Sequence, residues 1–94
     1  SSNSSESLYV VRDILKTEQS LYLSVMTMNG QISILRYNWE LNLEWVQSFS
    51  SDLKIEPDSM SVLPDDDLII PAITSSGSGY FRLNSPDGSI LLDI

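Results

Sequence analysis

The sequence has no cysteine and no histidine, and only five Lys and Arg residues stand against 13 Asp and Glu. The missing side chains exclude disulfides, zinc and haem ligation, thiol nucleophiles and imidazole bases, so a bound metal would have to be a hard ion held by oxygen. The formal net charge of -8 repels phosphate backbones, and the few cations form no cluster. Nucleic-acid binding is therefore not expected.

Long hydrophobic runs are also missing, since none approaches the roughly 18 residues of a membrane span. We therefore expect no membrane-spanning segment. With 94 residues the chain makes at most one small domain, whose core is modest and whose stability is marginal.

Residues 1–7 are small and polar, and six of them are Ser or Asn. They predict a flexible Ser-rich leader, which is either an ordinary terminus or the tether of a surface lipoprotein. The tether hypothesis places the protein outside the cytoplasm or at the cell surface, and a cytoplasmic location is the alternative. The absence of cysteine does not decide between them.

Short apolar runs separated by turn residues are typical of β structure. Asn29-Gly30 lies between two apolar runs, which predicts a hairpin because both residues accept positive φ. Ser85-Pro86-Asp87-Gly88 predicts a second hairpin. Residues 8–18 are ambiguous: Leu8, Val11 and Ile14 recur at helical spacing, whereas the β-branched pair Val10-Val11 favours a strand.

The chain resembles itself after a shift of 47 residues, which superposes Leu21 on Leu68 and Gly30 on Gly77. With one residue of slack, a shift of 46 superposes Arg36 on Arg82 and the later runs on each other. Each half then carries four predicted strands in the same order. These are residues 10–15, 20–26, 31–37 and 42–49 in the first half, and 59–63, 68–73, 79–83 and 89–93 in the second.

Four short antiparallel strands in each period of about 47 residues are typical of a β-propeller blade. The acidic turn Pro64-Asp65-Asp66-Asp67, the run Gly77-Ser78-Gly79-Tyr80-Phe81 and the turn Pro86-Asp87-Gly88 resemble blades of the kelch-like and quinoprotein-like repeat types found in bacterial propellers. The resemblance covers about two blades, although the first half lacks the Pro-Asp-Gly turn. It implies an all-β fold of two blade-like units, residues 8–49 and 58–94, joined by a linker over 50–57.

Two blades do not close a ring, because a propeller needs at least about four. The chain is therefore expected either to belong to a longer polypeptide or to complete a ring with other chains. The alternative is a small β-sandwich or barrel.

Catalysis is not expected from these residues. A Ser nucleophile would need Lys16 or Lys54 as its base, and no Gly-x-Ser-x-Gly elbow is present. Asp65, Asp66 and Asp67 are calcium candidates because adjacent carboxylates in a turn can hold that ion, but the twelve-residue calcium-loop spacing is missing, and soluble turn chemistry explains the cluster as well. No cofactor is predicted.

Aromatic residues are the other candidates for a site. Trp39 falls in a predicted turn, where an exposed indole favours a partner or a sugar ring, and Tyr37 and Tyr80 are the accompanying ligand-binding candidates. Trp45 alternates with Glu44 and is expected to face a neighbouring sheet.

The sequence thus favours a non-catalytic binding or scaffold module, part of a β-propeller surface protein that engages a protein or a glycan through its loops, or that associates with itself to complete a ring. Two alternatives stay open. The chain is a fragment of a propeller enzyme whose active site lies in other blades, or it is an accessory β-sandwich subunit.

Overall fold

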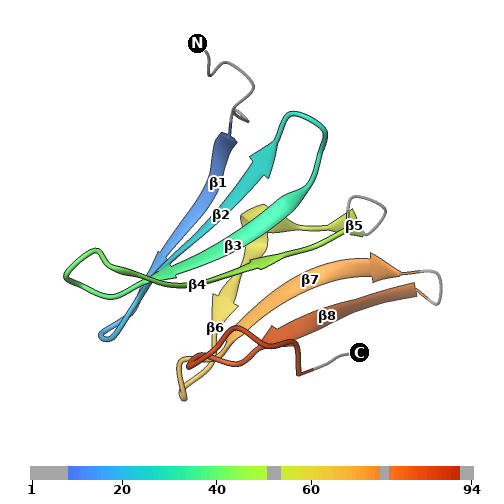
Figure 1. Cartoon of the computed structure of the whole chain (residues 1–94). Helices are drawn as coiled ribbons and strands as arrows, with labels where there is room; N and C mark the ends of the chain where they lie inside the picture. Colours follow the sequence, from blue (N-terminus) through green and yellow to red (C-terminus); the bar gives the residue numbers. More distant parts are fainter. Residues whose placement is uncertain (1–8, 51–53, 75–76, 92–94) are drawn as a thin grey trace, which may run out of the picture.

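The computed structural model describes residues 9–50, 54–74 and 77–91, and the predicted leader lies outside these ranges. The described chain is all-β: it holds eight strands, one short 3-10 turn and no α-helix (Figure 1). The elements are β1 (Tyr9–Lys16), β2 (Leu21–Thr27), β3 (Ile32–Tyr37), β4 (Leu43–Ser48), β5 (Lys54–Ile55), η1 (Pro57–Ser59), β6 (Ser61–Val62), β7 (Leu68–Thr74) and β8 (Gly77–Leu83).

The first four strands form an antiparallel sheet in the order β1-β2-β3-β4, which we call the N-terminal sheet. The ambiguous segment is strand β1, in which Arg12 forms a bulge between Val11 and Asp13. The hairpin predicted at Asn29-Gly30 is present between β2 and β3. Only Gly30 has positive φ there, at 89°, because the loop contains three residues and needs a single left-handed position.

The remaining strands form the C-terminal sheet, which is built around β7. β8 pairs with the whole of β7 along one edge, while β5 and β6 share the other edge with η1 between them. β5 lies inside the segment predicted as a linker. Of the fourth predicted strand in this half, the described residues show one bridge, Leu83 to Ile90, and residues 92–94 lie outside the described ranges.

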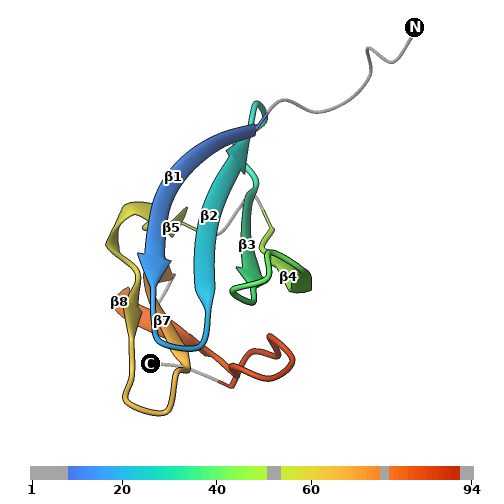
Figure 2. The same ribbon diagram turned by 90° about the vertical axis from the view of Figure 1, so that its left-hand side faces the viewer.

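The two sheets pack against each other face to face, and Figures 1 and 2 show β7 and β8 beneath the N-terminal sheet. Their facing side chains make one core, in which Tyr22, Ile34, Leu68, Ile70 and Leu83 have no exposed surface. Burial of such side chains contributes about 1.5 to 3 kcal/mol each.

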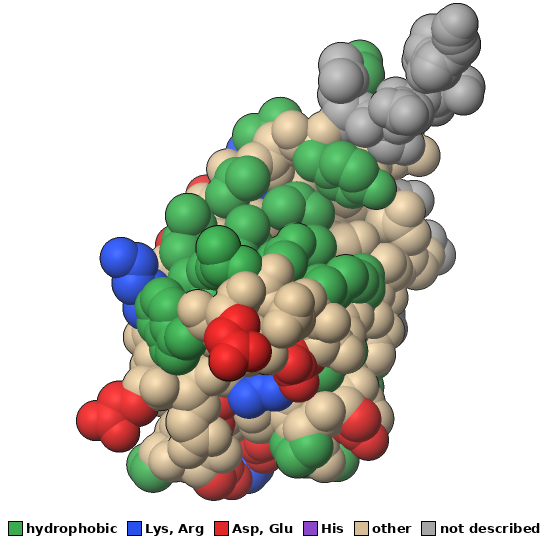
Figure 3. Space-filling model, turned by 60° about the vertical axis from the view of Figure 1, so that its left-hand side comes forward, with side chains coloured by type: hydrophobic (Ala, Val, Ile, Leu, Met, Phe, Trp, Pro, Cys, Tyr) green, Lys and Arg blue, Asp and Glu red, His purple; other side chains and the backbone are tan. Residues whose placement is uncertain are grey.

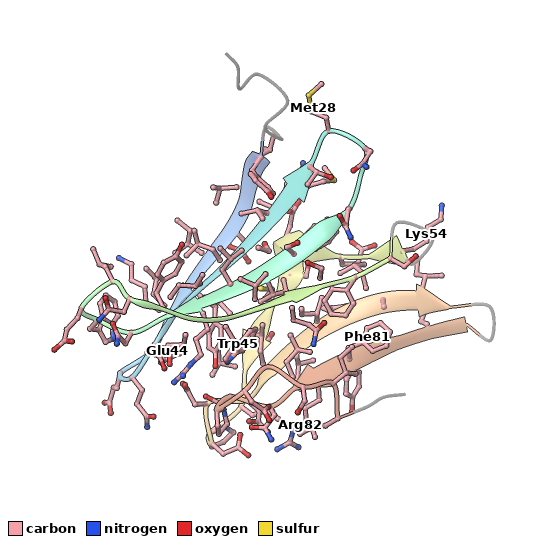
Figure 4. All side chains as sticks on the ribbon, viewed as in Figure 1. Met28, Glu44, Trp45, Lys54, Phe81 and Arg82 are labelled. Atoms are coloured by element: carbon pink, nitrogen blue, oxygen red, sulfur yellow. The ribbon has the colours of Figure 1, made fainter. Side chains whose placement is uncertain are left out.

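Trp45 confirms the expectation that it faces the neighbouring sheet. It is 9% exposed, and its indole N–H donates to the Ser85 carbonyl at 2.7 Å. Figure 4 shows Trp45 and Phe81 pointing into the space between the two sheets. The ring of Phe81 lies 5.5 Å from that of Phe49, so aromatic contacts join both sheets.

The β2-β3 and β7-β8 hairpins share one register. Leu21 pairs with Tyr37 as Leu68 pairs with Leu83, and the same shifts of 47 and 46 carry every β2-β3 pair onto a β7-β8 pair. A polar contact repeats as well, because the Nε of Arg36 donates to Ser20 and the Nε of Arg82 donates to Asp67. The two hairpins therefore present their aligned residues at equivalent positions.

Candidate binding surface

The N-terminal sheet has a second apolar face, which points away from the core. Residues alternate between the two faces of a strand, so the buried Tyr22 and Ser24 place their neighbours in β2 on the opposite side. Cross-strand pairing then assigns the other strands. We call this surface the outer face; its apolar residues are Tyr9, Val11, Ile14, Leu21, Leu23, Val25, Leu35, Tyr37, Leu43 and Val46.

Charged groups are nearly absent from the outer face. Only Lys16, at the end of β1, shares it among the described strand residues, and the hydroxyls of Ser33 and Ser48 hydrogen-bond to each other at 2.9 Å. Tyr9, Val11 and Val46 are each half exposed or more. Figure 3 shows the apolar side chains gathered into one continuous area, and a shallow depression of about 360 Å³ lies over its centre.

When one face of a sheet is exposed to solvent, the sequence of each strand normally alternates between apolar and polar residues. When both faces are covered, the sequence of each strand is a nearly continuous apolar run. β2 contains such a run, from Leu21 to Met26, interrupted only by Ser24. This run is the signal for the outer face. The same run predicts both a strand and a second apolar face of the sheet.

The three aromatic candidates lie in different places. Tyr37 belongs to the outer face, and Tyr80 lies opposite Pro71 on the far side of the C-terminal sheet, where it is 47% exposed. Trp39 lies in the turn between β3 and β4 and is half exposed; its indole N–H donates to the Thr17 carbonyl at 3.0 Å. The structure therefore does not bring Tyr80 together with the other two.

The calcium candidates are engaged with protein groups. Asp66 accepts hydrogen bonds from Ser20 at 2.8 Å and Ser85 at 3.1 Å, and Arg36 lies 3.5 Å from the same oxygen. Asp65 and Asp67 both contact the guanidinium of Arg82 at 2.8 Å.

These contacts keep the buried Asp66 ionised. Burial acts to raise the pKa of Asp66, but the opposing contacts with Ser20, Thr17 and Ser85 and the charge of Arg36 together hold it below its ordinary value. The carboxylate thereby ties the turn before β7 to the N-terminal sheet.

Metal ligands do not gather anywhere in the part of the chain that the structure describes, where no three His, Cys, Asp or Glu side chains form a group able to hold an ion. Across the same residues there is no helix with the length and apolar character needed to cross a membrane. The outer face is thus the feature with the strongest functional implication.

Comparison with protein-family models, with curated proteins and with solved structures finds no match for this chain.

Proposed function

We propose that the protein is a non-catalytic binding or scaffold module that docks another protein on the outer face. The observation that carries this proposal is a sheet that is apolar on both sides, with one side packed on the core and the other open. Monomeric proteins rarely expose contiguous apolar areas larger than a few hundred Å². The near absence of charge on this face is also typical of the centre of a protein interface.

The chemistry of the outer face favours a protein over a glycan. A sugar ring needs hydrogen-bonding groups around an aromatic platform, but Ser33 and Ser48 satisfy each other. The N–H of Trp39 is occupied by the Thr17 carbonyl. An apolar face of paired strands fits a second apolar sheet or a hydrophobic segment better.

The finer proposal is that the two sheets are blade-like repeats of a β-propeller, whose blades stack face to face. The common register of the β2-β3 and β7-β8 hairpins supports two copies of one unit. The open outer face supports a further neighbour on the N-terminal side of the stack. An extracytoplasmic location belongs to the same proposal and rests on the Ser-rich residues 1–7.

Photo-crosslinking of the protein in its native host tests the docking function. Tyr37 is replaced by p-benzoylphenylalanine, which keeps an aromatic ring on the outer face. A matched control carries the same group at Met28, which is 80% exposed at the tip of the β2-β3 turn (Figure 4). We expect one discrete protein adduct from position 37 that disappears when Val46→Lys is added to the same chain.

Circular dichroism of each variant establishes that the fold is intact. The proposal would be wrong if position 37 gives no adduct in the host, or if positions 37 and 28 give the same adducts. It would also be wrong if Val46→Lys leaves a position 37 adduct unchanged.

A further inference from the structure

We infer that the partner on the outer face is a second copy of this chain, bound head to tail, so that the exposed side of one C-terminal sheet covers the outer face of the next copy. This inference rests on the proposed docking function and names its occupant. Such a contact joins two different surfaces of identical chains, and it is therefore heterologous.

The β2-β3 and β7-β8 hairpins have the same register. Leu21 and Leu23 on the outer face correspond to Leu68 and Ile70, which are fully buried against the inner face of the N-terminal sheet. Leu35 and Tyr37 correspond likewise to Phe81 and Leu83 in that same buried contact. The outer face thus has apolar side chains at the same positions as the side of the C-terminal sheet that is buried in the core.

The same register identifies the surface that would cover the outer face. Within the molecule, the covering surface is the inner face of the N-terminal sheet, with Tyr22, Met26 and Ile34. By the same shifts, these residues correspond to Ile69, Ile73 and Tyr80 on the exposed side of the C-terminal sheet.

Ile73 and Tyr80 are 49% and 47% exposed. The outer face and the exposed side of the C-terminal sheet therefore correspond to the two surfaces that meet in the core, and both are exposed to solvent.

Polar residues lie at equivalent positions beside the two surfaces. Inside the molecule, Arg36 reaches across the contact to Asp66 in the turn before β7. The equivalent of Arg36 is Arg82, which contacts Asp65 and Asp67 within its own sheet. The equivalent of Asp66 is the neutral Gln19 in the turn before β2, and the neighbouring Glu18 corresponds to Asp65. Both turn residues are exposed. A head-to-tail contact would bring Arg82 of one copy beside Gln19 and Glu18 of the next.

Light scattering during size-exclusion chromatography of the purified chain tests this inference with two blocking variants. Val46→Lys places a charge on the outer face, and Tyr80→Lys places one on the exposed side of the C-terminal sheet. Met28→Lys adds the same charge at a turn tip outside both surfaces. Far-UV circular dichroism establishes that all of them fold.

We expect the wild-type chain and Met28→Lys to elute as assemblies of at least two copies. Each blocking variant should elute near the single-chain mass of 10.5 kDa. An equimolar mixture of the two blocked variants should recover a dimer of about twice that mass, because it retains one intact outer face and one intact covering surface.

A monomeric wild-type chain at about 100 µM would overturn the inference, since a specific sheet-to-sheet contact should hold at that concentration. So would a dimer that Val46→Lys abolishes and Tyr80→Lys leaves intact, because this pattern means two outer faces pack on each other. The docking function itself would survive either result if position 37 still crosslinks to a different protein in the host.

Discussion

The indole of Trp45 lies directly on the backbone of Gly88. A Cβ atom added at Gly88 would approach the Cδ2 and Cε3 atoms of Trp45 to 2.5 Å, and the φ of this glycine is 76°. Gly88 also offers its carbonyl to the side chain of Gln47 at 2.8 Å. This one position therefore has a steric and a conformational requirement for glycine.

Gly88→Ala should lower the free energy of unfolding by about 3 kcal/mol, because it adds overpacking against a buried ring to the strain of a left-handed alanine. Gly30→Ala is the matched control. Gly30 also has positive φ, at 89°, but no atom lies within 4 Å of an added Cβ, so only about 1 kcal/mol should be lost. Urea unfolding measures both, and equal losses would contradict the role assigned to Trp45.

Leu41 is one of two described non-glycine residues with positive φ, at 67°, and its side chain is 66% exposed in the β3-β4 turn. Leu41→Gly should raise the free energy of unfolding by about 1 kcal/mol, since it removes the left-handed strain. Leu41→Ala removes the exposed side chain and keeps the strain, so it should not stabilise. A thermal melt that rises equally for both variants would show that side-chain exposure, not backbone strain, matters there.

At the scale of whole elements, the turn before β7 is fastened to the N-terminal sheet by buried polar contacts. The Tyr22 hydroxyl donates to the Asp66 carbonyl at 2.7 Å, and the side chain of Asp66 binds Ser20 and Arg36. Buried charges of this kind hold two elements in one arrangement, because removing one partner leaves the other without compensation.

Asp66→Asn should therefore cost about 2 kcal/mol of unfolding free energy at pH 7, as Arg36 and the surrounding hydroxyls lose a buried carboxylate. Asp58→Asn is the control, because Asp58 pairs with Arg12 at 3.1 Å on an exposed part of the surface and should change stability little. Chemical denaturation of both variants checks this. If both variants lost a similar amount of unfolding free energy, Asp66 would contribute no more to stability than an exposed carboxylate does.

The strands were largely predictable from the sequence because their signals are local. Asn29-Gly30 and the apolar runs around it suffice to place β2 and β3, and the β-branched pair Val10-Val11 correctly favoured a strand for β1. The partners of Asp66 were not predictable in the same way. Arg36 is 30 residues away in the chain and reaches Asp66 only after the sheets pack.

The outer face is also predictable from the sequence, because its signal lies within a single strand. Leu21, Leu23 and Val25 interleave with the core residues of β2, so both sides of the strand are apolar. What covers the second side depends on other surfaces, and only the register of β7-β8 relates the two faces to each other. The strand pattern thus predicts a second apolar face, whereas the register that relates the two sheets is seen only in the tertiary structure.

At the scale of the whole molecule, acidification acts on several carboxylates together. The pKa values of Asp66, Asp58 and Asp87 all lie below their ordinary value. At Asp66, burial raises the pKa but hydrogen bonds outweigh it. The hydrogen bond from Arg12 is the largest cause of the lowered pKa at Asp58, and the hydrogen bond from the Ser89 backbone N–H is the largest cause at Asp87. A lowered folded-state pKa contributes stability that is present above the unfolded pKa of about 4 and is lost as the pH falls through the folded value.

The net charge of -8 works in the other direction, because its self-repulsion is relieved as the pH approaches the isoelectric point near 4.1. In about 0.2 M salt this repulsion and the exposed Arg12–Asp58 pair are largely screened, whereas the buried Asp66–Arg36 contact is screened much less. Under these conditions the free energy of unfolding should stay level from pH 7 to about pH 5 and fall below about pH 4.

Asp66→Asn should lose less of its stability over the same acid range. If urea titrations of the wild-type chain and this variant fell in parallel, acid sensitivity would have to come from exposed carboxylates, and the contact between the two sheets would not depend on the ionisation of Asp66.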